Sequence, residues 1–141
     1  MENQIISDTF IVFMRKMNAW EVAADTELGD NFELFDDADW QEKQTQIVRE
    51  IFEEHLTQKE RKYGMLSAGI SVGFPPKYDP EKETITSIEV KGNSAVLTTQ
   101  KNYAGIERER IYKLKKVNER WKIDTAKEKS KYDDKWHSVI F

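Results

Sequence analysis

Apolar side chains recur every three or four positions through residues 5–25, which is the spacing of one face of an α-helix. The helix predicted there carries a wide stripe of aromatic and methionine side chains, and Gly29 follows its end. We expect this stripe to form part of the core. Its members are Ile6, Phe10, Phe13, Met14, Met17 and Trp20.

A second stripe with the helical period predicts another helix over residues 40–56. Asp39 precedes it and is placed to cap it, because an aspartate oxygen accepts hydrogen bonds from the free N–H groups of a first turn. Thr57 is placed to cap a short third helical turn over residues 58–62, which Gly64 would close. The stripe of the second helix consists of Ile47, Val48, Ile51, Phe52, His55 and Leu56.

Residues 64–80 interrupt the helical pattern, since they hold three of the six glycines and all three prolines. Glycine permits backbone angles that other residues avoid, and proline removes a donor and fixes φ. No long helix can run through this segment, which we call the seam. It contains G-x-S-x-G at residues 69–73, but the prolines that follow argue against the strand–serine–helix turn of a hydrolase.

Beyond the seam the apolar residues tend to alternate, which is the period of a half-buried strand. The predicted strands cover residues 84–91, 94–101, 107–117, the residues around Trp121 and Ile123, and residues 136–141. Turns are expected at residues 92–93, 102–105, 118–119 and 133–134. Alternate residues of a strand share one face. We expect such faces on the first strand, with Thr86, Ile88 and Val90, and on the third, with Arg108, Arg110, Tyr112 and Leu114.

Helices followed by strands with hairpin-length links predict an α+β fold with an antiparallel meander. We expect two to three N-terminal helices packed on one face of a curved antiparallel sheet of four to six strands, which together form a half-closed cone. The length of 141 residues fits one domain, over residues 1–141.

The chain has no cysteine, which excludes disulfides, thiolate metal sites and a cysteine nucleophile. Its composition, 38% hydrophobic and 34% charged, is typical of a soluble globular protein. The longest apolar run covers residues 10–14, far short of the ~20 residues that span a bilayer. The N-terminus lacks a basic region of the secretory type. We therefore expect a cytoplasmic protein with no membrane segment and no cofactor.

The net charge of -4 conceals a strong asymmetry between the two halves. Residues 1–60 carry 15 acidic and 5 basic side chains, a net of -10, and residues 61–141 carry 11 acidic and 17 basic, a net of +6. The simplest interpretation is that each half balances the surface charge of the other, but the asymmetry is more informative than the total. Nucleic-acid binding is not expected, because the chain is acidic overall and phosphate contacts dominate such binding.

The window from Asp25 to Glu42 contains eight acidic residues, three aromatic residues and no basic one. Its central part, residues 30–40, is expected to be a loop. One interpretation is a solvated loop pinned by aromatic residues. The other is a partner-binding face, in which aromatic side chains act as anchors and carboxylates steer a basic partner. The candidate partner-binding residues are Asp30, Phe32, Glu33, Phe35, Asp36, Asp37 and Asp39.

The interior of the predicted cone is the other candidate site. Core packing is the simplest interpretation of its side chains, and an acid or base held in a ligand pocket is the alternative. No metal site is predicted, because neither histidine has a second histidine three or four residues away and the calcium-loop spacing is absent. The candidate lining residues are His55, Tyr103, Arg108, Arg110, Tyr112 and Trp121.

Residues 75–80 read P-P-x-Y-D-P, within a recognisable stretch over residues 73–83, and residues 61–64 read R-K-Y-G. Together with residues 17–21, 96–99 and 121–124, these segments resemble bacterial immunity proteins that carry the nuclear transport factor 2 fold. The resemblance extends from the first helix to Asp124. It implies the same α+β cone, with Pro75, Pro76 and Pro80 fixing the entry into the sheet and Trp121 packing the cone.

The resemblance also implies a function. Such proteins are antidotes of polymorphic toxin systems, so we expect the chain to bind and neutralise a cognate toxin by occlusion, in the cytoplasm and without catalysis. No catalytic residue is carried over. The alternative is a small-ligand-binding protein, or an enzyme of the isomerase or dehydratase type, that uses the cone cavity. The sequence does not decide the oligomeric state, and a homodimer through the sheet is one arrangement.

Overall fold

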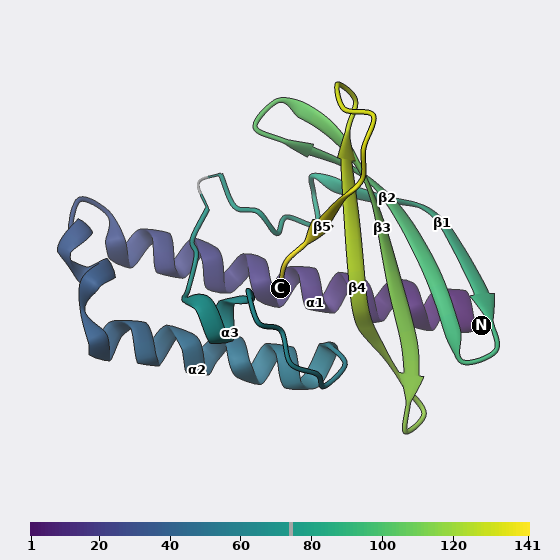
Figure 1. The fold of residues 1–141 in the computed structure, drawn as a ribbon, viewed down its shortest axis with the longest axis horizontal. Helices are drawn as coiled ribbons and strands as arrows, with labels where there is room; N and C mark the ends of the chain where they lie inside the picture. The colour runs from purple at the N-terminus through teal and green to yellow at the C-terminus, as the bar shows by residue number, and fades with distance from the viewer. Residues whose placement is uncertain (74) are drawn as a thin grey trace.

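The computed structural model describes residues 1–73 and 75–141, so Phe74 of the recognisable stretch lies outside the described residues. Two long helices lie side by side, and an antiparallel sheet packs across one half of the pair (Figure 1). The helices are α1 (Glu2–Leu28), the 3₁₀ helix η1 (Phe32–Asp36), α2 (Ala38–His55) and α3 (Met65–Ala68). The strands are β1 (Glu83–Lys91), β2 (Ser94–Tyr103), β3 (Ile106–Val117), β4 (Arg120–Ser130) and β5 (His137–Val139).

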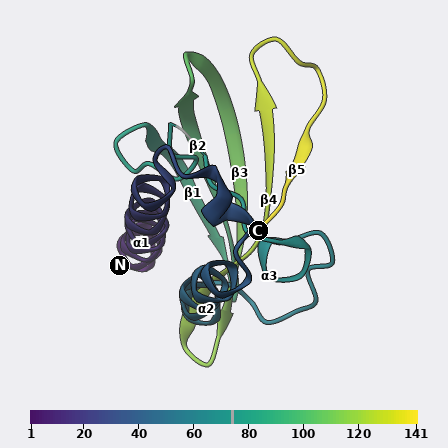
Figure 2. The same cartoon turned by 90° about the vertical axis from the view of Figure 1, so that its left-hand side faces the viewer.

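The five strands lie in the sheet in their chain order, β1-β2-β3-β4-β5, and every neighbouring pair is antiparallel. The expected meander and the α+β cone, with helices on one face of the sheet, are therefore confirmed. Figure 2 shows this arrangement along the helix pair, with α1 and α2 on the same side of the sheet. Two-residue turns join the first four strands, and Asn118 and Glu119 have φ of 51° and 66°, as a twist-matched hairpin turn requires.

The predicted core stripe of α1 is confirmed, because all six of its side chains are buried. Phe10 meets Tyr112 of β3 edge to face, with ring centroids 4.8 Å apart. Phe13 lies 6.1 Å from the ring of Phe141. Each such side chain contributes roughly 1.5–3 kcal/mol when it is fully removed from water. The apolar stripe of α1 is thus the surface on which the sheet and α2 assemble.

The predicted start of the second helix is wrong by two residues. Asp37, not Asp39, caps α2, because its side chain accepts a hydrogen bond from the N–H of Trp40 at 2.9 Å. Asp39 lies in the first helical turn, where a carboxylate also favours the positive end of the helix. Much of the expected loop before α2 is η1. Ile47 of the predicted stripe is 36% exposed, whereas Trp40 and Gln44 are buried.

The predicted third helical turn over residues 58–62 is also wrong, since the third helix is α3, on the other side of Gly64. Contacts with β4 replace the helical hydrogen bonds. The N–H of Thr57 donates to the carbonyl of Ile123 at 2.9 Å. The guanidinium of Arg61 donates to the carbonyls of Thr57 and Asp124, both at 3.1 Å.

A bulge in β1 changes which side chains face the core. The register shifts between Ile85 and Ser87, so Ile85 and Ile88 both pack against the core while Thr86 is exposed. The predicted face with Thr86 and Ile88 together is therefore wrong. The face predicted for β3 is confirmed, because Arg110, Tyr112 and Leu114 are buried and Arg108 is half-buried.

Gly64 sits where the backbone passes residue 141. A Cβ at Gly64 would lie 1.9 Å from the carbonyl oxygen of Phe141, which accepts a hydrogen bond from the N–H of Met65 at 3.2 Å. We predict that Gly64→Ala lowers the free energy of unfolding by about 1–3 kcal/mol, because the chain must shift to relieve the overlap. Urea unfolding followed by circular dichroism measures this, with the exposed Ser67→Ala as the control. Equal stability of the two variants would contradict the prediction.

Candidate partner-binding surface

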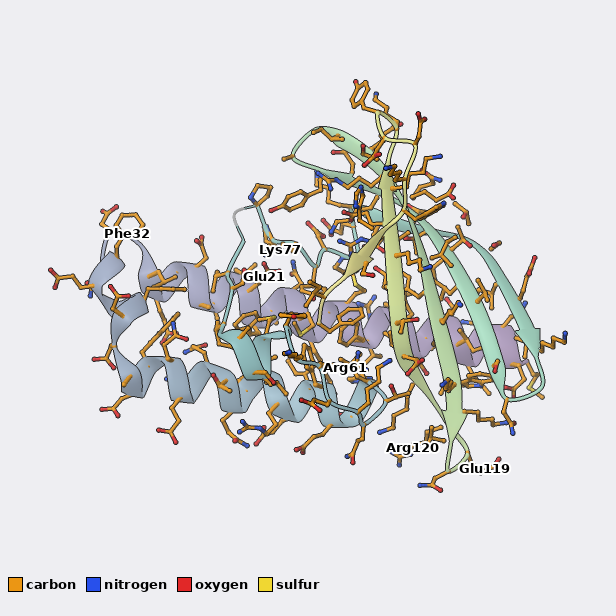
Figure 3. The ribbon with its side chains drawn as sticks, in the orientation of Figure 1. Glu21, Phe32, Arg61, Lys77, Glu119 and Arg120 are labelled. Carbon is orange, nitrogen blue, oxygen red and sulfur yellow. The ribbon has the colours of Figure 1, made fainter. Side chains whose placement is uncertain are left out.

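The acidic tip is the connection between α1 and α2, defined here as residues 30–39. It projects beyond the edge of the sheet at one end of the helix pair (Figure 1). All seven candidate partner-binding residues lie on it and are exposed. Phe32 is 77% exposed and points away from the body of the protein, as Figure 3 shows. Phe35 is 40% exposed. The structure therefore brings the predicted carboxylates and aromatic rings together on one accessible surface.

The tip is held in shape by hydrogen bonds to its own backbone and to α2. The N–H of Asn31 donates to the carbonyl of Leu28 at 2.6 Å, and the side chain of Gln41 donates to the carbonyl of Phe35 at 2.7 Å. The ring of Phe35 packs against Trp40, with centroids 6.2 Å apart, and Trp40 is buried. The exposed side chains thus project from an ordered support, which reduces the entropy lost when a partner binds.

The tip is a region of concentrated negative charge. Five carboxylates occupy its ten residues, and no basic residue occurs between Asp25 and Glu42. At its base on α2, Lys43 reaches Glu27 of α1 at 3.8 Å, across exposed side chains. Such an exposed pair contributes little to stability, and within the described residues no ion pair joins a cation to a carboxylate of the tip. The surface is therefore suited to a positively charged partner.

The interior of the cone holds a second group of charged residues, and these are paired. Glu83 accepts hydrogen bonds from the hydroxyls of Tyr112 and Thr99, and Arg110 lies 3.7 Å from the same carboxylate. Arg110 also donates to Glu128 at 2.7 Å. Glu83, Thr99 and Arg110 are all buried. Two of the predicted lining residues, Arg110 and Tyr112, are therefore engaged in one internal network.

The edge of this network carries two more of the predicted residues. Arg108 donates to Glu128 at 2.9 Å, and its guanidinium lies over the half-buried ring of Tyr103 at 5.8 Å. Burial would raise the pKa of Glu128, but Arg110 and Arg108 outweigh it and lower the pKa below its usual value. Burial, together with Arg110, lowers the pKa of Lys101 to about 8.

The remaining two predicted residues lie elsewhere. His55 is buried at the end of α2 and its Nε2 has no hydrogen-bond partner among the described residues. Burial lowers the pKa of His55, which the carboxylate of Glu54 offsets only in part. Trp121 is buried and donates to Glu2 at 2.7 Å. Both residues line a surface pocket of about 320 Å3 beside the start of α1, outside the Glu83 network.

Sequence reasoning missed the residue that joins the two halves of the fold. Glu21 of α1 is buried and accepts hydrogen bonds from the N–H groups of Gly73, at 2.9 Å, and Tyr78, at 3.0 Å. Asn18 donates to the carbonyl of Tyr78 at 2.7 Å. A Cβ at Gly73 would lie 2.9 Å from the Glu21 carboxylate, so glycine allows this approach. Figure 3 shows Glu21 beneath the segment that carries Lys77.

These contacts explain two of the recognisable segments. Residues 17–21 and residues 73–83 lie far apart in the chain but are bonded to each other through Asn18 and Glu21. The signal available in the sequence was a glutamate on the apolar side of a helix, one position after Trp20. Ser71 of the G-x-S-x-G pattern lies in irregular backbone and accepts a hydrogen bond from Lys77 at 2.8 Å. The hydrolase turn is therefore absent from residues 69–73.

Two further observations concern metal binding and membrane insertion. Residues 1–73 and 75–141 contain no group of three or more histidine, cysteine or carboxylate side chains that could hold a metal ion. No helix in these residues is both long and apolar enough to span a bilayer.

An α+β cone with an exposed acidic surface and a paired interior is consistent with an antitoxin protein. The chain belongs to the NTF2 fold immunity protein family, whose model matches residues 5–139. Immunity protein RhsIA of Dickeya dadantii (strain 3937) is 33% identical over 120 residues, which make up 85% of this chain and 72% of RhsIA. No solved structure gave a significant match. Family membership supports a toxin-neutralising role.

The contact between Glu21 and the seam is open to a direct test. We predict that Glu21→Gln lowers the free energy of unfolding by about 1.5–3 kcal/mol, because one of two charge-assisted hydrogen bonds to buried N–H groups is lost. Chemical denaturation measures this, and Asp8→Asn, at an exposed position of the same helix, is the control. A Glu21→Gln protein as stable as the control would show that the contact is dispensable.

Proposed function

We propose that the protein neutralises its cognate toxin by occlusion, with the acidic tip docking on a basic surface of the toxin. The observation that carries the proposal is the exposed tip itself: five carboxylates and two exposed phenylalanines on an ordered turn, with no basic residue among them. If the toxin is a nuclease, the carboxylates would occupy the positions of substrate phosphates. The proposal involves no reaction on the immunity protein.

Electrostatics would act mainly on the rate of association. A concentrated negative surface attracts a basic partner over about one Debye length, which is ~8 Å at physiological ionic strength. The tip lies at the extreme end of the helix pair, away from the basic sheet half of the chain (Figure 1). Its field is therefore not cancelled by neighbouring lysines. Charge complementarity of this kind also disfavours partners with acidic surfaces.

Phe32 would supply the binding energy that charges alone do not. Interfaces depend on a few aromatic anchors that enter pockets of the partner, and the surrounding polar residues exclude water. Phe32 is 77% exposed, between Asp30 and Glu33. Phe35, on the same turn, is 40% exposed, and apolar side chains that are exposed close together favour a role in binding more than single ones do.

The alternative of an enzyme in the cone has less support from the side chains that would carry it. Catalysis needs an acid or base that can exchange protons with a substrate. The buried carboxylate of Glu83 is bonded to Tyr112 and Thr99, and Arg110 is held by Glu128. Most of these groups are bonded to one another, although Glu83 Oε1 has only Arg110 at 3.7 Å, and such mutual bonding is typical of a structural network. Binding without catalysis is therefore the function that we propose.

The charge of the tip gives the first functional prediction. We predict that the variant with Asp30→Asn, Glu33→Gln, Asp36→Asn and Asp37→Asn binds the cognate toxin ~30-fold more weakly, since each exposed charge contributes roughly 0.5 kcal/mol. Asparagine still caps α2 at position 37, so the fold is expected to persist. Surface plasmon resonance at several salt concentrations measures both the affinity and its salt dependence.

A control variant changes the net charge equally, at four exposed acids on or beside the sheet. It carries Glu81→Gln, Glu89→Gln, Glu107→Gln and Asp134→Asn. It should bind the toxin as the unmodified protein does. Unchanged affinity and unchanged salt dependence in the tip variant would remove the acidic tip from the mechanism.

The anchor role of Phe32 gives a separate prediction. Phe32→Ala should change the stability by no more than ~0.5 kcal/mol, because the side chain is exposed, yet weaken toxin binding by ~30-fold or more, as loss of an interface hot spot does. Phe35→Ala, next to Trp40, is the comparison and should affect stability more. Isothermal titration and thermal melting separate the two effects. Full toxin affinity in the Phe32→Ala protein would contradict the anchor role.

A further inference from the structure

A basic groove lies at the opposite end of α2 from the acidic tip. It has a volume of about 670 Å3 and runs between the segment after α2 and the β3–β4 hairpin. Four cationic side chains line it, and Asp124 is the single carboxylate in its described lining. The four are Lys59, Lys115, Arg120 and Lys122. Figure 3 places Arg61 and Arg120 at this end and Phe32 at the other.

The cations of the basic groove are not balanced within it. Asp124 is shared between Lys59, at 3.1 Å, and Lys115, at 3.5 Å. Lys115 and Lys122 are directly opposite each other on β3 and β4, and like charges in that position are destabilising. Burial would raise the pKa of Asp124, but hydrogen bonds from Thr57 and Lys59 outweigh it and lower the pKa, so this carboxylate is already committed. Lys122 also donates to the backbone carbonyl of Glu53 at 2.8 Å, which does not neutralise its charge, so the groove keeps an excess of positive charge.

An apolar pocket continues from the basic groove. It has a volume of about 330 Å3 and shares Thr57, Gln58 and Lys59 with the groove. Its apolar side chains come from α2, from the residues around α3 and from the end of the described chain, namely Phe52, Leu56, Leu66 and Phe141. Two cations and two acids, Arg49, Arg61, Glu53 and Glu60, also line this pocket and balance each other in number. The excess positive charge therefore lies in the groove, and the combined surface fits a segment that carries several carboxylates next to one aromatic side chain.

The acidic tip has this chemistry. We propose that the basic groove and apolar pocket bind the acidic tip of a second copy of this chain, with Phe32 in the apolar pocket and the carboxylates around Asp30, Glu33 and Asp36 facing the four cations. Both halves of the contact are present in one molecule: five acids without a basic neighbour at one end, and four cations around one acid at the other. Aromatic anchors and charge complementarity are the features that specify such interfaces.

The geometry of this contact has a consequence for assembly. Because the two surfaces are different, each copy retains a free tip or a free groove after pairing, and the contact is heterologous. Copies would therefore associate head to tail in a manner that depends on concentration and salt. The inference rests on the proposed function in one respect, since self-association would cover the same tip that binds the toxin and the toxin would compete with it.

The test uses the purified full chain and sedimentation velocity over a hundredfold range of concentration. The unmodified protein should associate more as concentration rises and dissociate when salt is raised. The groove variant, with Lys59→Gln, Lys115→Gln and Lys122→Gln, should have an apparent dissociation constant about tenfold higher. The control, with Lys91→Gln, Lys127→Gln and Lys135→Gln at exposed positions, should associate as the unmodified protein does.

A mixing experiment identifies the two surfaces. The groove variant keeps an intact tip, and the tip variant described above keeps an intact groove. Each alone should be largely monomeric, while an equimolar mixture should form one-to-one pairs and nothing longer. Pairing in the mixture would support the proposal. A protein that stays monomeric throughout would overturn it, and so would a dimer indifferent to salt and to both variants, as expected for pairing through the sheet.

The result is distinguishable from a failure of the proposed function. Toxin binding is measured at dilution, where the chain is monomeric, and there the groove variant should bind the toxin with unchanged affinity. If the tip variant binds the toxin normally, the proposed function fails whatever the sedimentation shows. If the unmodified chain does not associate, the inference fails while toxin binding through the tip stands.

Discussion

The carboxylate of Glu21 connects the helical half of the chain to the sheet half. It accepts two backbone hydrogen bonds from the seam, while Asn18, one helical turn earlier, donates to the seam at Tyr78. The seam is rich in proline and glycine and forms few regular hydrogen bonds of its own, so its N–H groups need partners of this kind. With the seam attached to α1, β1 begins beside the helix and the meander is built outward from it. The position of the sheet on the helix pair therefore depends on this contact.

The position of the sheet in turn sets the two ends of the molecule apart. The sheet covers one half of the helix pair, so the connection between α1 and α2 remains uncovered (Figure 1). The residues that follow α2 instead meet β4, because Thr57 and Arg61 donate hydrogen bonds to backbone carbonyls of that strand. One end of α2 therefore carries acids in water, and the other end adjoins the lysines of β3 and β4. The charge asymmetry of the sequence thus places the acidic tip and the lysines of β3 and β4 at opposite ends of α2.

The sequence predicted best what short-range patterns decide. The stripe of α1 keeps a single period from Ile6 to Trp20, and each of the first three hairpin turns contains a glycine or an asparagine that accepts positive φ, so these elements lie where expected. Distant contacts decided what was missed. As residue types, Asp37 and Asp39 are equally good helix caps. In the structure Asp37 is the cap, and Trp40, in the first turn of the helix, is buried in the core. Residues 58–62 exchange helical hydrogen bonds for bonds to β4. The acidic tip was visible in the composition of one short window, whereas the basic groove joins two segments that are distant in the chain, the one after α2 and the β3–β4 hairpin.

The contrast between interior and surface charges favours binding over catalysis. Inside the cone, Arg110 has Glu83 and Glu128, and Glu83 has Tyr112 and Thr99, so these charges contribute to a unique packing. At the tip, five carboxylates repel one another, and the hydrogen bonds that shape the turn come mainly from backbone groups that any sequence could supply. Replacing some of these acids by lysine would relieve the repulsion at no loss of packing. Asp37 and Asp39 stabilise the start of α2, whereas the other three carboxylates of the tip have no hydrogen bond or ion pair among the described residues. The proposed partner of opposite charge would remove their repulsion on binding.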